Sequence, residues 1–234
     1  MKKTIGIIGG MGPLATAKLF EKIVLYTKAD LDQDHPHTII DSNTKIPDRT
    51  SYILQGGESP MEELTKSVKR LKEAGADFLV MPCNTAHYFY DELKSAADIP
   101  FINMISETVS TIKKDFPGMK VGLLSTSGTI SSGVYSSELE KQGIEYAIPT
   151  GAQQDAVMDL IYNIKKGMYD NDLKGFNKAI GELKDQGSKV IILGCTELSV
   201  AYDMYGLPEE VSYVDALRVL AREAVIQSGC DINT

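Results

Sequence analysis

The regular alternation of short apolar runs with amphipathic segments constrains the fold of this chain more than any other feature. The apolar runs lie at 4–8, 38–40, 78–81, 101–102, 121–124 and 190–193. Each is bounded by Gly, Pro or Asp, as buried strands commonly are. Helical periodicity occupies the segments 14–26, 61–74, 131–142, 154–166 and 173–186. This alternation predicts an α/β fold in which helices cover both faces of parallel sheets.

An internal repeat divides this pattern into two halves. TIGIIGGMGP at 4–13 matches KVGLLSTSGT at 120–129, and ADFLVMPCNTAH at 76–87 matches SKVIILGCTELS at 188–199. The spacing also agrees, because 78 positions separate Ile5 from Cys83 and 74 separate Val121 from Cys195. We therefore expect two pseudo-symmetric α/β lobes, each a parallel sheet flanked by helices, with a cleft between them. The expected lobes are residues 1–108 and 109–213, with the C-terminal helix in 214–234 packing back on the first.

A cysteine follows the second matched strand of each half. Sites in open α/β sheets form outside the carboxyl ends of the strands, so Cys83 and Cys195 are expected to approach one cleft from opposite sides. Each precedes a helix start, where unpaired N–H groups and the helix dipole favour the thiolate and can hold an anion. Two bases on opposite faces of one carbon can invert a stereocentre. The alternative is that a buried cysteine is only a small hydrophobe, which is our interpretation of Cys230.

Composition argues against several other classes of protein. The net charge is -8 and no segment combines clustered Lys and Arg with aromatics, so we expect no nucleic-acid partner. No apolar run approaches the roughly 20 residues that span a bilayer, so we expect no membrane partner. The three cysteines are widely spaced and contain no CxxC pair, which argues against a disulfide framework or a metal site. A reducing, cytoplasmic location fits this cysteine usage.

Four motifs occur in order along the chain: GGMGP at 9–13, IPDRT at 46–50, MPCNTAH at 81–87 and GCTE at 194–197. Together they resemble the cofactor-independent aspartate racemases of the aspartate/glutamate racemase superfamily, and the likeness covers nearly the whole chain. The resemblance implies a two-lobed α/β fold, a homodimer and no pyridoxal phosphate or other cofactor. It also implies that L- and D-aspartate, or glutamate, are interconverted with Cys83 and Cys195 as the two acid/base groups.

Two alternatives to an aspartate racemase remain open from the sequence. One is a broad-specificity amino-acid racemase with the same mechanism, and the other is a non-catalytic two-lobed binding protein. Relatives that act as glutamate racemases carry an acidic residue in the first turn and a histidine two positions after the second cysteine. This chain has Gly10-Met11 and Glu197 at those places. The departures weaken the case for a dedicated glutamate racemase.

The resemblance also implies a set of substrate contacts at the same edge of the sheets. These are Met11, Arg49, Asn84, Thr85, Thr126, Ser127, Lys165, Thr196 and Glu197. Arg49 is the first candidate for the distal carboxylate because its planar fork binds carboxylates bidentately, although a charge in a Pro-Asp turn can be merely solvated. The resemblance does not decide between Lys165 and Lys166 as the second clamp. We favour Lys165, and the alternative is that both lysines only close a helix.

Three further features have competing interpretations. Glu197 could orient the substrate ammonium, tune Cys195, or stabilise the N-terminus of its helix. His87 lies one helical turn after Cys83 and could touch it, or could simply be packed. The stretch GMGPLA at 10–15 fits a dinucleotide fingerprint, but Asp41 follows about 30 residues later instead of the expected roughly 20. Dinucleotide binding is therefore not expected.

Overall fold

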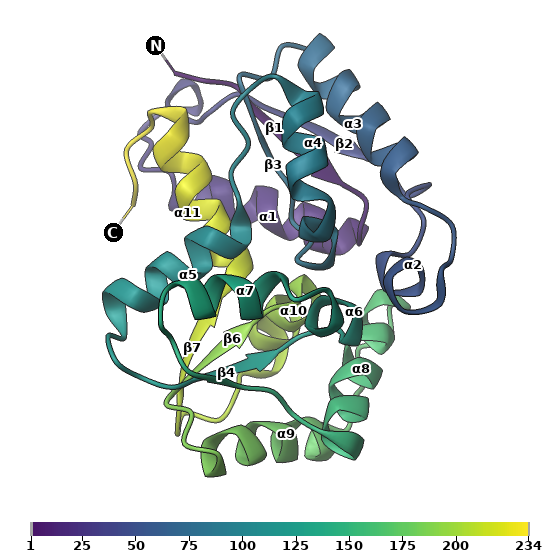
Figure 1. Cartoon of the computed structure of the whole chain (residues 1–234). Coiled ribbons are helices and arrows are strands. Elements are labelled where there is room, and N and C mark those ends of the chain that lie inside the picture. The colour runs from purple at the N-terminus through teal and green to yellow at the C-terminus, as the bar shows by residue number, and fades with distance from the viewer. Residues whose placement is uncertain (1, 234) are drawn as a thin grey trace.

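Two α/β lobes make up the molecule, one above the other in Figure 1. The structure is a computed structural model that describes residues 2–233. Strands are labelled β, α-helices α and 3₁₀ helices η. The first lobe contains, in chain order, β1 (Ile5–Gly9), α1 (Pro13–Tyr26), η1 (Asp32–Asp34), β2 (Thr38–Ser42), α2 (Arg49–Gln55), α3 (Met61–Glu73), β3 (Phe78–Val80), η2 (Thr85–Phe89) and α4 (Tyr90–Ala97). The chain continues with α5 (Met104–Asp115), β4 (Val121–Leu124), α6 (Ser127–Ser132), α7 (Val134–Lys141), β5 (Tyr146–Ala147), α8 (Gly151–Lys165), α9 (Lys174–Asp185), β6 (Val190–Leu193), α10 (Thr196–Tyr205), β7 (Ser212–Asp215) and α11 (Ala216–Ser228).

Each lobe is built on a parallel sheet. The strand order is β2-β1-β3 in the first sheet and β5-β4-β6-β7 in the second. Ile5 of β1 lies opposite Phe78 of β3, and Val121 of β4 lies opposite Val190 of β6. The two sheets therefore share one arrangement, with β7 as an additional edge strand. The predicted α/β fold with two similar lobes is confirmed.

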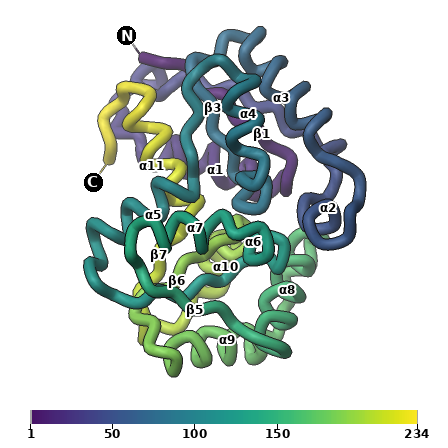
Figure 2. Tube along the Cα trace, viewed as in Figure 1, coloured from purple at the N-terminus to yellow at the C-terminus, as the bar shows by residue number. Residues whose placement is uncertain are grey.

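The apolar runs are buried because helices cover both faces of the sheets. In β1, Ile5 and Ile7 face a core shared with α1 and α11, whereas Ile8 faces a core shared with α3 and α4. Figure 2 shows the same arrangement, with α3 and α4 on one side of the first lobe and α11 on the other. Both faces of β1 are apolar, which explains why the run is continuous instead of alternating with polar residues. Within residues 2–233, no helix has the length and apolar character needed to cross a membrane.

Several expected elements differ in detail from the observed ones. The segment 101–102 forms only an isolated bridge, in which Phe101 pairs with Leu79. The single helix expected at 131–142 is divided into α6 and α7, because Gly133 adopts a left-handed conformation with φ 74° that glycine tolerates best. Strands β5 and β7 were not predicted, because β5 has only two residues and β7 (SYVD) has no continuous apolar run.

Two helices cross between the lobes. Helix α11 follows β7 of the second sheet, yet its Leu217 and Leu220 lie in the core of the first lobe with β1. Helix α5 begins with Met104 in that same core, whereas its Val109 packs in the core of the second lobe. The predicted boundary at residues 108–109 falls inside α5. The division into 1–108 and 109–213 stays a prediction.

Candidate active site

Cys83 and Cys195 line one cavity between the two lobes. Cys83 follows β3 of the first lobe, and Cys195 follows β6 and caps the N-terminus of α10 in the second. Both thiols are free and nearly covered, with 5% and 6% of the residue exposed. The space enclosed is about 10 Å³, which is room for one water molecule at most. The structure therefore brings the two predicted cysteines together in a closed, almost filled site.

The lining of this cavity contains most of the residues singled out from the sequence. It consists of Met11, Asp48, Arg49, Thr50, Cys83, Asn84, Thr85, Thr126, Tyr162, Lys165, Cys195, Thr196 and Glu197. Ser127 is the predicted residue that does not line it. Its neighbour Thr126 caps α6 at the cavity, whereas the Ser127 hydroxyl accepts a hydrogen bond from Gln154 at 3.2 Å.

Cys195 carries a carboxylate partner. Its Sγ donates a hydrogen bond to Oε2 of Glu197 at 3.0 Å, and the other oxygen of that carboxylate pairs with Nζ of Lys165 at 2.7 Å. Burial, and next the charge of Glu197, raise the pKa of the Cys195 thiol well above its ordinary value. The charge of Lys165, and next the Glu197 amide at the start of α10, lower that pKa, but both effects are outweighed. The expectation that this position favours the thiolate is therefore wrong for Cys195, because burial and Glu197 favour the thiol.

Cys83 lies near the guanidinium of Arg49. Only 8% of Arg49 is exposed, and its Nη1 donates to the carbonyl of Pro47 at 2.9 Å. Burial opposes the charge, but Cys83, Asp48 and Glu197 together raise the pKa of Arg49. Its Nε has no hydrogen-bond partner among the described residues. Arg49 is thus a buried cation in the cavity wall, not a solvated loop charge.

The setting of Cys83 differs from that of Cys195. A 3₁₀ helix, η2, follows Cys83 at a distance of two residues, and Asn84 is its N-cap. The geometry of a 3₁₀ helix is poorer and its run is short. The prediction that both cysteines occupy equivalent helix starts therefore holds for Cys195 and only approximately for Cys83.

Polar side chains connect the two lobes around the cysteines. The hydroxyl of Thr85 in the first lobe shares hydrogen bonds with those of Thr126 and Thr129 in the second, at 3.1 and 2.8 Å. Tyr135 donates to Oδ1 of Asn84 at 2.7 Å. The Nδ2 of Asn84 remains buried with no partner among the described residues. A buried, unpaired donor is costly to leave unused, so Nδ2 is available to an acceptor placed in the cavity.

Lys165 and Lys166 have different surroundings. Lys165 pairs with Glu197 and lines the cysteine cavity, whereas Lys166 is exposed and caps the end of α8. Burial would lower the pKa of Lys165, but the charges of Glu197 and Cys195 raise it. The side chain therefore stays cationic. Of the two lysines left open by the sequence, the structure places Lys165 at the site.

The sequence reasoning missed three residues that line the cavity. Asp48 and Thr50 flank Arg49, and Tyr162 lies three residues before Lys165 on α8. Residues three apart share one face of a helix, so the spacing to Lys165 was a usable signal for Tyr162. Burial, and next the charge of Asp48, raise the pKa of Tyr162. No comparable signal marked Asp48, because a carboxylate before a helix also serves as its cap, as this one does through the amide of Ser51.

His87 does not face the thiol of Cys83. Its Nε2 accepts a hydrogen bond from the amide of Met104 at 3.1 Å, which leaves Nδ1 protonated to donate to the carbonyl of Cys83 at 2.8 Å. Burial lowers the pKa of His87 from 6.5 to about 4, against the opposing effect of that carbonyl. His87 is therefore a neutral, packed histidine that holds the backbone of Cys83.

Comparisons with known proteins agree with this geometry. The family model described as Asp/Glu/Hydantoin racemase matches residues 8–224. The chain is 31% identical over 225 residues to the broad specificity amino-acid racemase RacX of Bacillus subtilis, covering 94% of this chain and 96% of that protein. It superposes on the aspartate racemase of Picrophilus torridus with a TM-score of 0.87 at 34% identity, covering 99% and 96% of the two chains. For a putative Asp/Glu racemase from Yersinia pestis the TM-score is 0.79 at 28% identity, with coverage of 97% and 99%.

Proposed function

The chain belongs to the Asp/Glu/Hydantoin racemase family, and on that premise we propose that it interconverts L- and D-aspartate by a two-base mechanism that uses no pyridoxal phosphate. The broader activity, that of an amino-acid racemase and hence an isomerase, follows from the family and its aspartate racemase neighbour. The observation that carries the finer proposal is that Cys83 and Cys195, one from each lobe, line the same closed cavity.

The reaction consists of two proton transfers. One cysteine, as thiolate, takes the α-hydrogen of the amino acid as a proton and becomes a thiol. The other cysteine, as thiol, gives its proton to the opposite face of the α-carbon and becomes a thiolate. The net result is an inverted centre and exchanged protonation states of the two sulfurs, so the next turnover runs in the opposite sense. This is general acid and base catalysis without a covalent intermediate.

Glu197 makes the resting site asymmetric. Because burial and this carboxylate raise the pKa of Cys195, the free enzyme carries the proton on Cys195 as the acid. The base of the first turnover is then Cys83, beside the cationic Arg49. The free enzyme can therefore react directly with the enantiomer whose α-hydrogen faces Cys83.

Cations and amide donors in the wall suit a dicarboxylic substrate. The buried Arg49 and the partly exposed Lys165 are two cations that could bind two carboxylates. The unpaired Nδ2 of Asn84 and the hydroxyl of Thr196 can stabilise the charge that develops on the α-carboxylate when the proton leaves. In this proposal Glu197 accepts the substrate ammonium in exchange for one of its present partners, Lys165 or Cys195. The residues thus support aspartate, with glutamate as a second acidic substrate.

A broad-specificity amino-acid racemase is the second candidate, favoured by the likeness to the Bacillus subtilis protein. Proton NMR in deuterated water over all common amino acids separates the two, because deuterium at the α-carbon reports the proton transfer itself. Exchange of aspartate and glutamate that is much faster than exchange of alanine supports the acidic specificity. Equal exchange of alanine and aspartate would favour the broad racemase, and no exchange with any amino acid would refute the proposed activity.

We also propose that the enzyme works as a cytoplasmic homodimer. The support is the family resemblance, the free cysteines and a set of exposed apolar side chains on α1, namely Phe20, Val24 and Leu25. Exposed apolar patches commonly mark protein interfaces. Light scattering coupled to size-exclusion chromatography measures the mass directly, and a monomer at all concentrations would contradict the dimer.

A further inference from the structure

A second cavity adjoins the cysteine cavity and is much larger. It has a volume of about 490 Å³, within the range of small-molecule sites. Five residues line both cavities: Met11, Asp48, Arg49, Lys165 and Glu197. We call the two spaces the inner cavity, with the cysteines, and the outer chamber. They are neighbouring compartments of one cleft, separated by a wall of side chains.

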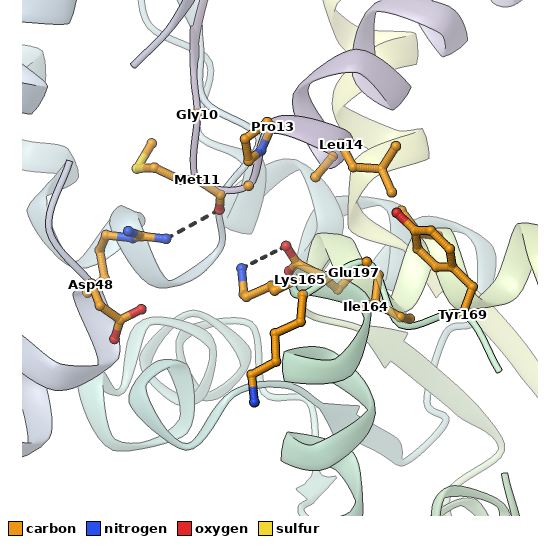
Figure 3. A pocket seen from close by; sticks show the side chains of 15 residues that line it. Gly10, Met11, Pro13, Leu14, Asp48, Ile164, Lys165, Tyr169 and Glu197 are labelled. Atoms are coloured by element: carbon orange, nitrogen blue, oxygen red, sulfur yellow. Dashed lines mark hydrogen bonds and ion pairs between the residues drawn. The ribbon is translucent and has the colours of Figure 1, made fainter. Parts of the chain in front are cut away.

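The wall has one part from each lobe, and each part is held by an interaction within its own lobe. In the second lobe Lys165 pairs with Glu197 at 2.7 Å, and in the first lobe Nη2 of Arg49 approaches the carbonyl of Met11 at 3.4 Å. Figure 3 shows the Lys165–Glu197 pair between Asp48 on one side and Leu14 and Tyr169 on the other. Neither interaction joins the two lobes. The wall can therefore open without breaking a charge pair across the cleft.

Lys165 is the movable part of this wall. Its side chain is 23% exposed, compared with 5% for Glu197. Glu197 is also held by the thiol of Cys195. A lysine ends in a compact charge on a flexible stem, so its ammonium can leave Glu197 while the methylenes stay against an apolar neighbour. Displacement of Lys165 joins the two compartments.

Beyond the wall, the described lining of the outer chamber is mostly apolar, with the exposed Lys166 as its one charged residue. Pro13 and Leu14 of α1, Ile164 of α8, Val200 of α10 and Tyr169 line it. Leu14 and Tyr169 are 37% and 44% exposed, so the chamber also opens to solvent. The carboxylates in its lining, Asp48 and Glu197, belong to the shared wall. Lys166 is exposed, so its ammonium can stay in solvent while the apolar residues of the lining contact a hydrocarbon chain.

We propose that the outer chamber is a side-chain subsite, which takes the tail of α-amino acids with long, unbranched apolar side chains once Lys165 has swung aside. This rests on the proposed racemase activity and deepens it. Aspartate, whose side chain ends at the wall, leaves the chamber empty. A short apolar amino acid such as alanine has no carboxylate for the cations of the wall and does not reach the chamber. A side chain long enough to pass the wall is buried against Leu14, Ile164 and Val200.

A homologous substrate series tests the subsite. We would follow α-deuterium exchange by proton NMR for alanine, 2-aminobutyrate, norvaline, norleucine, 2-aminoheptanoate and 2-aminooctanoate, with aspartate as reference. Burial of each added methylene should raise kcat/KM about fourfold once the chain passes the wall. A rate that falls or stays level along the series in the wild-type enzyme would overturn the proposal.

The matched variants are Leu14→Trp, which fills the chamber, and Met119→Trp, which changes an exposed apolar residue that lines neither cavity. We expect Leu14→Trp to lower the ratio of 2-aminooctanoate to aspartate exchange about tenfold or more, and Met119→Trp to leave it unchanged. An equal loss for both substrates would show that the chamber is only a passage. If no amino acid exchanges, the racemase proposal fails, and calorimetric binding of 2-aminooctanoate to the wild-type and Leu14→Trp proteins still decides on the subsite.

Discussion

At the scale of single residues, similar side chains have acquired different roles through their neighbours. Cys83 lies near a buried arginine and Cys195 donates to a carboxylate, whereas Cys230 packs in an apolar core and donates to the backbone carbonyl of Asp34 at 3.5 Å. All three are free and buried. Burial alone therefore does not distinguish a catalytic thiol from an inert one, and the charged partner does.

Each of the two cavity cysteines should be essential. We expect Cys83→Ser and Cys195→Ser each to lower racemisation of aspartate about 1,000-fold or more, because a general acid or base is lost. Cys230→Ser is the matched control and should retain activity. Polarimetry gives the rates, and circular dichroism checks that the fold is intact. Near-normal turnover in either of the first two variants would show that its cysteine is misassigned.

Lys165 and Lys166 form a natural pair for mutagenesis. Lys165→Met removes a cation that lines the cysteine cavity, so kcat/KM for aspartate should fall about 100-fold, as for other preorganised donors. Lys166→Met removes an exposed charge and should change kcat/KM for aspartate by about twofold at most. Steady-state kinetics with aspartate on both variants show which of the two lysines contributes to kcat/KM. Equal losses would refute the assignment of Lys165.

Glu197 should control the protonation of Cys195. In Glu197→Gln the negative charge is removed while Lys165 remains, so the pKa of Cys195 falls and the thiolate forms at lower pH. The ultraviolet absorbance of the thiolate, followed against pH in a Cys83→Ser, Cys230→Ser background with and without the change, measures this directly. An unchanged titration would contradict the role of Glu197.

At the scale of elements, His87 connects the cysteine loop to a crossing helix. Its ring joins the carbonyl of Cys83 to the amide of Met104, where α5 begins, and stacks on Tyr90 with ring centroids 5.8 Å apart. The capping side chain of Asn103 fixes the same helix start through the amides of Ile105 and Ser106. The position of Cys83 is therefore coupled to the helix that continues into the second lobe.

This arrangement predicts a stability loss in acid. Burial lowers the pKa of His87 from 6.5 to about 4, so between these values the unfolded chain takes up a proton that the folded protein does not. Stability from the neutral ring is fully present above about pH 6.5 and decreases as the pH falls towards 4, by at most ~3 kcal/mol. Chemical denaturation of the wild-type and His87→Asn proteins at several pH values measures this change in the free energy of unfolding. Parallel pH curves for the two proteins would exclude this role.

The two hydrogen bonds of His87 can be separated by choice of substitution. Asparagine offers a donor near the Nδ1 position, whereas glutamine reaches the Nε2 position. If the carbonyl of Cys83 is the contact that matters for catalysis, His87→Asn should retain more of kcat than His87→Gln. A purely structural role predicts that kcat follows thermal stability alone in both variants.

At the scale of the whole molecule, the site exists only while the lobes are closed on each other. Helix α2 of the first lobe packs on α6 of the second through Gly128, where an added Cβ would lie 2.7 Å from Oγ1 and 2.9 Å from Cα of Thr50. Because one of these two atoms belongs to the backbone of Thr50, rotation of its side chain cannot make room, and α2 and α6 must move apart to accept a methyl group at residue 128. Arg49 and Thr50 both belong to α2 and would move with it.

Gly128→Ala should therefore impair catalysis through the lobe arrangement. Displacement of α2 misplaces Arg49, and misplacement of about 1 Å can cost about 100-fold in rate. Gly181→Ala in α9 is the control, because nothing lies within 4 Å of its Cβ position, and it should be neutral or stabilising by up to ~1 kcal/mol. Kinetics and thermal melting separate the effects. Normal turnover in Gly128→Ala would show that close packing of α2 on α6 is dispensable.

The sequence by itself determined the α/β fold, the two similar lobes and the strand-end positions of Cys83 and Cys195. These depend on local signals, namely apolar periodicity, turn residues and a repeat, which are legible along the chain. It did not reveal β7, since a short edge strand is defined by the neighbour with which it pairs. It also did not show the break at Gly133 within the helix expected at 131–142.

Only the tertiary structure decided which side chains meet. It placed the carboxylate of Glu197 beside Cys195 and directed His87 to the backbone instead of the thiol. It also placed Lys165, but not Lys166 or Ser127, in the lining of the cysteine cavity. Each of these outcomes depends on atoms contributed by segments that are distant in the sequence, and the same segments determine how deeply a charged group is buried. Burial and partner charge set the pKa of a group, and neither is encoded in the spacing of a motif.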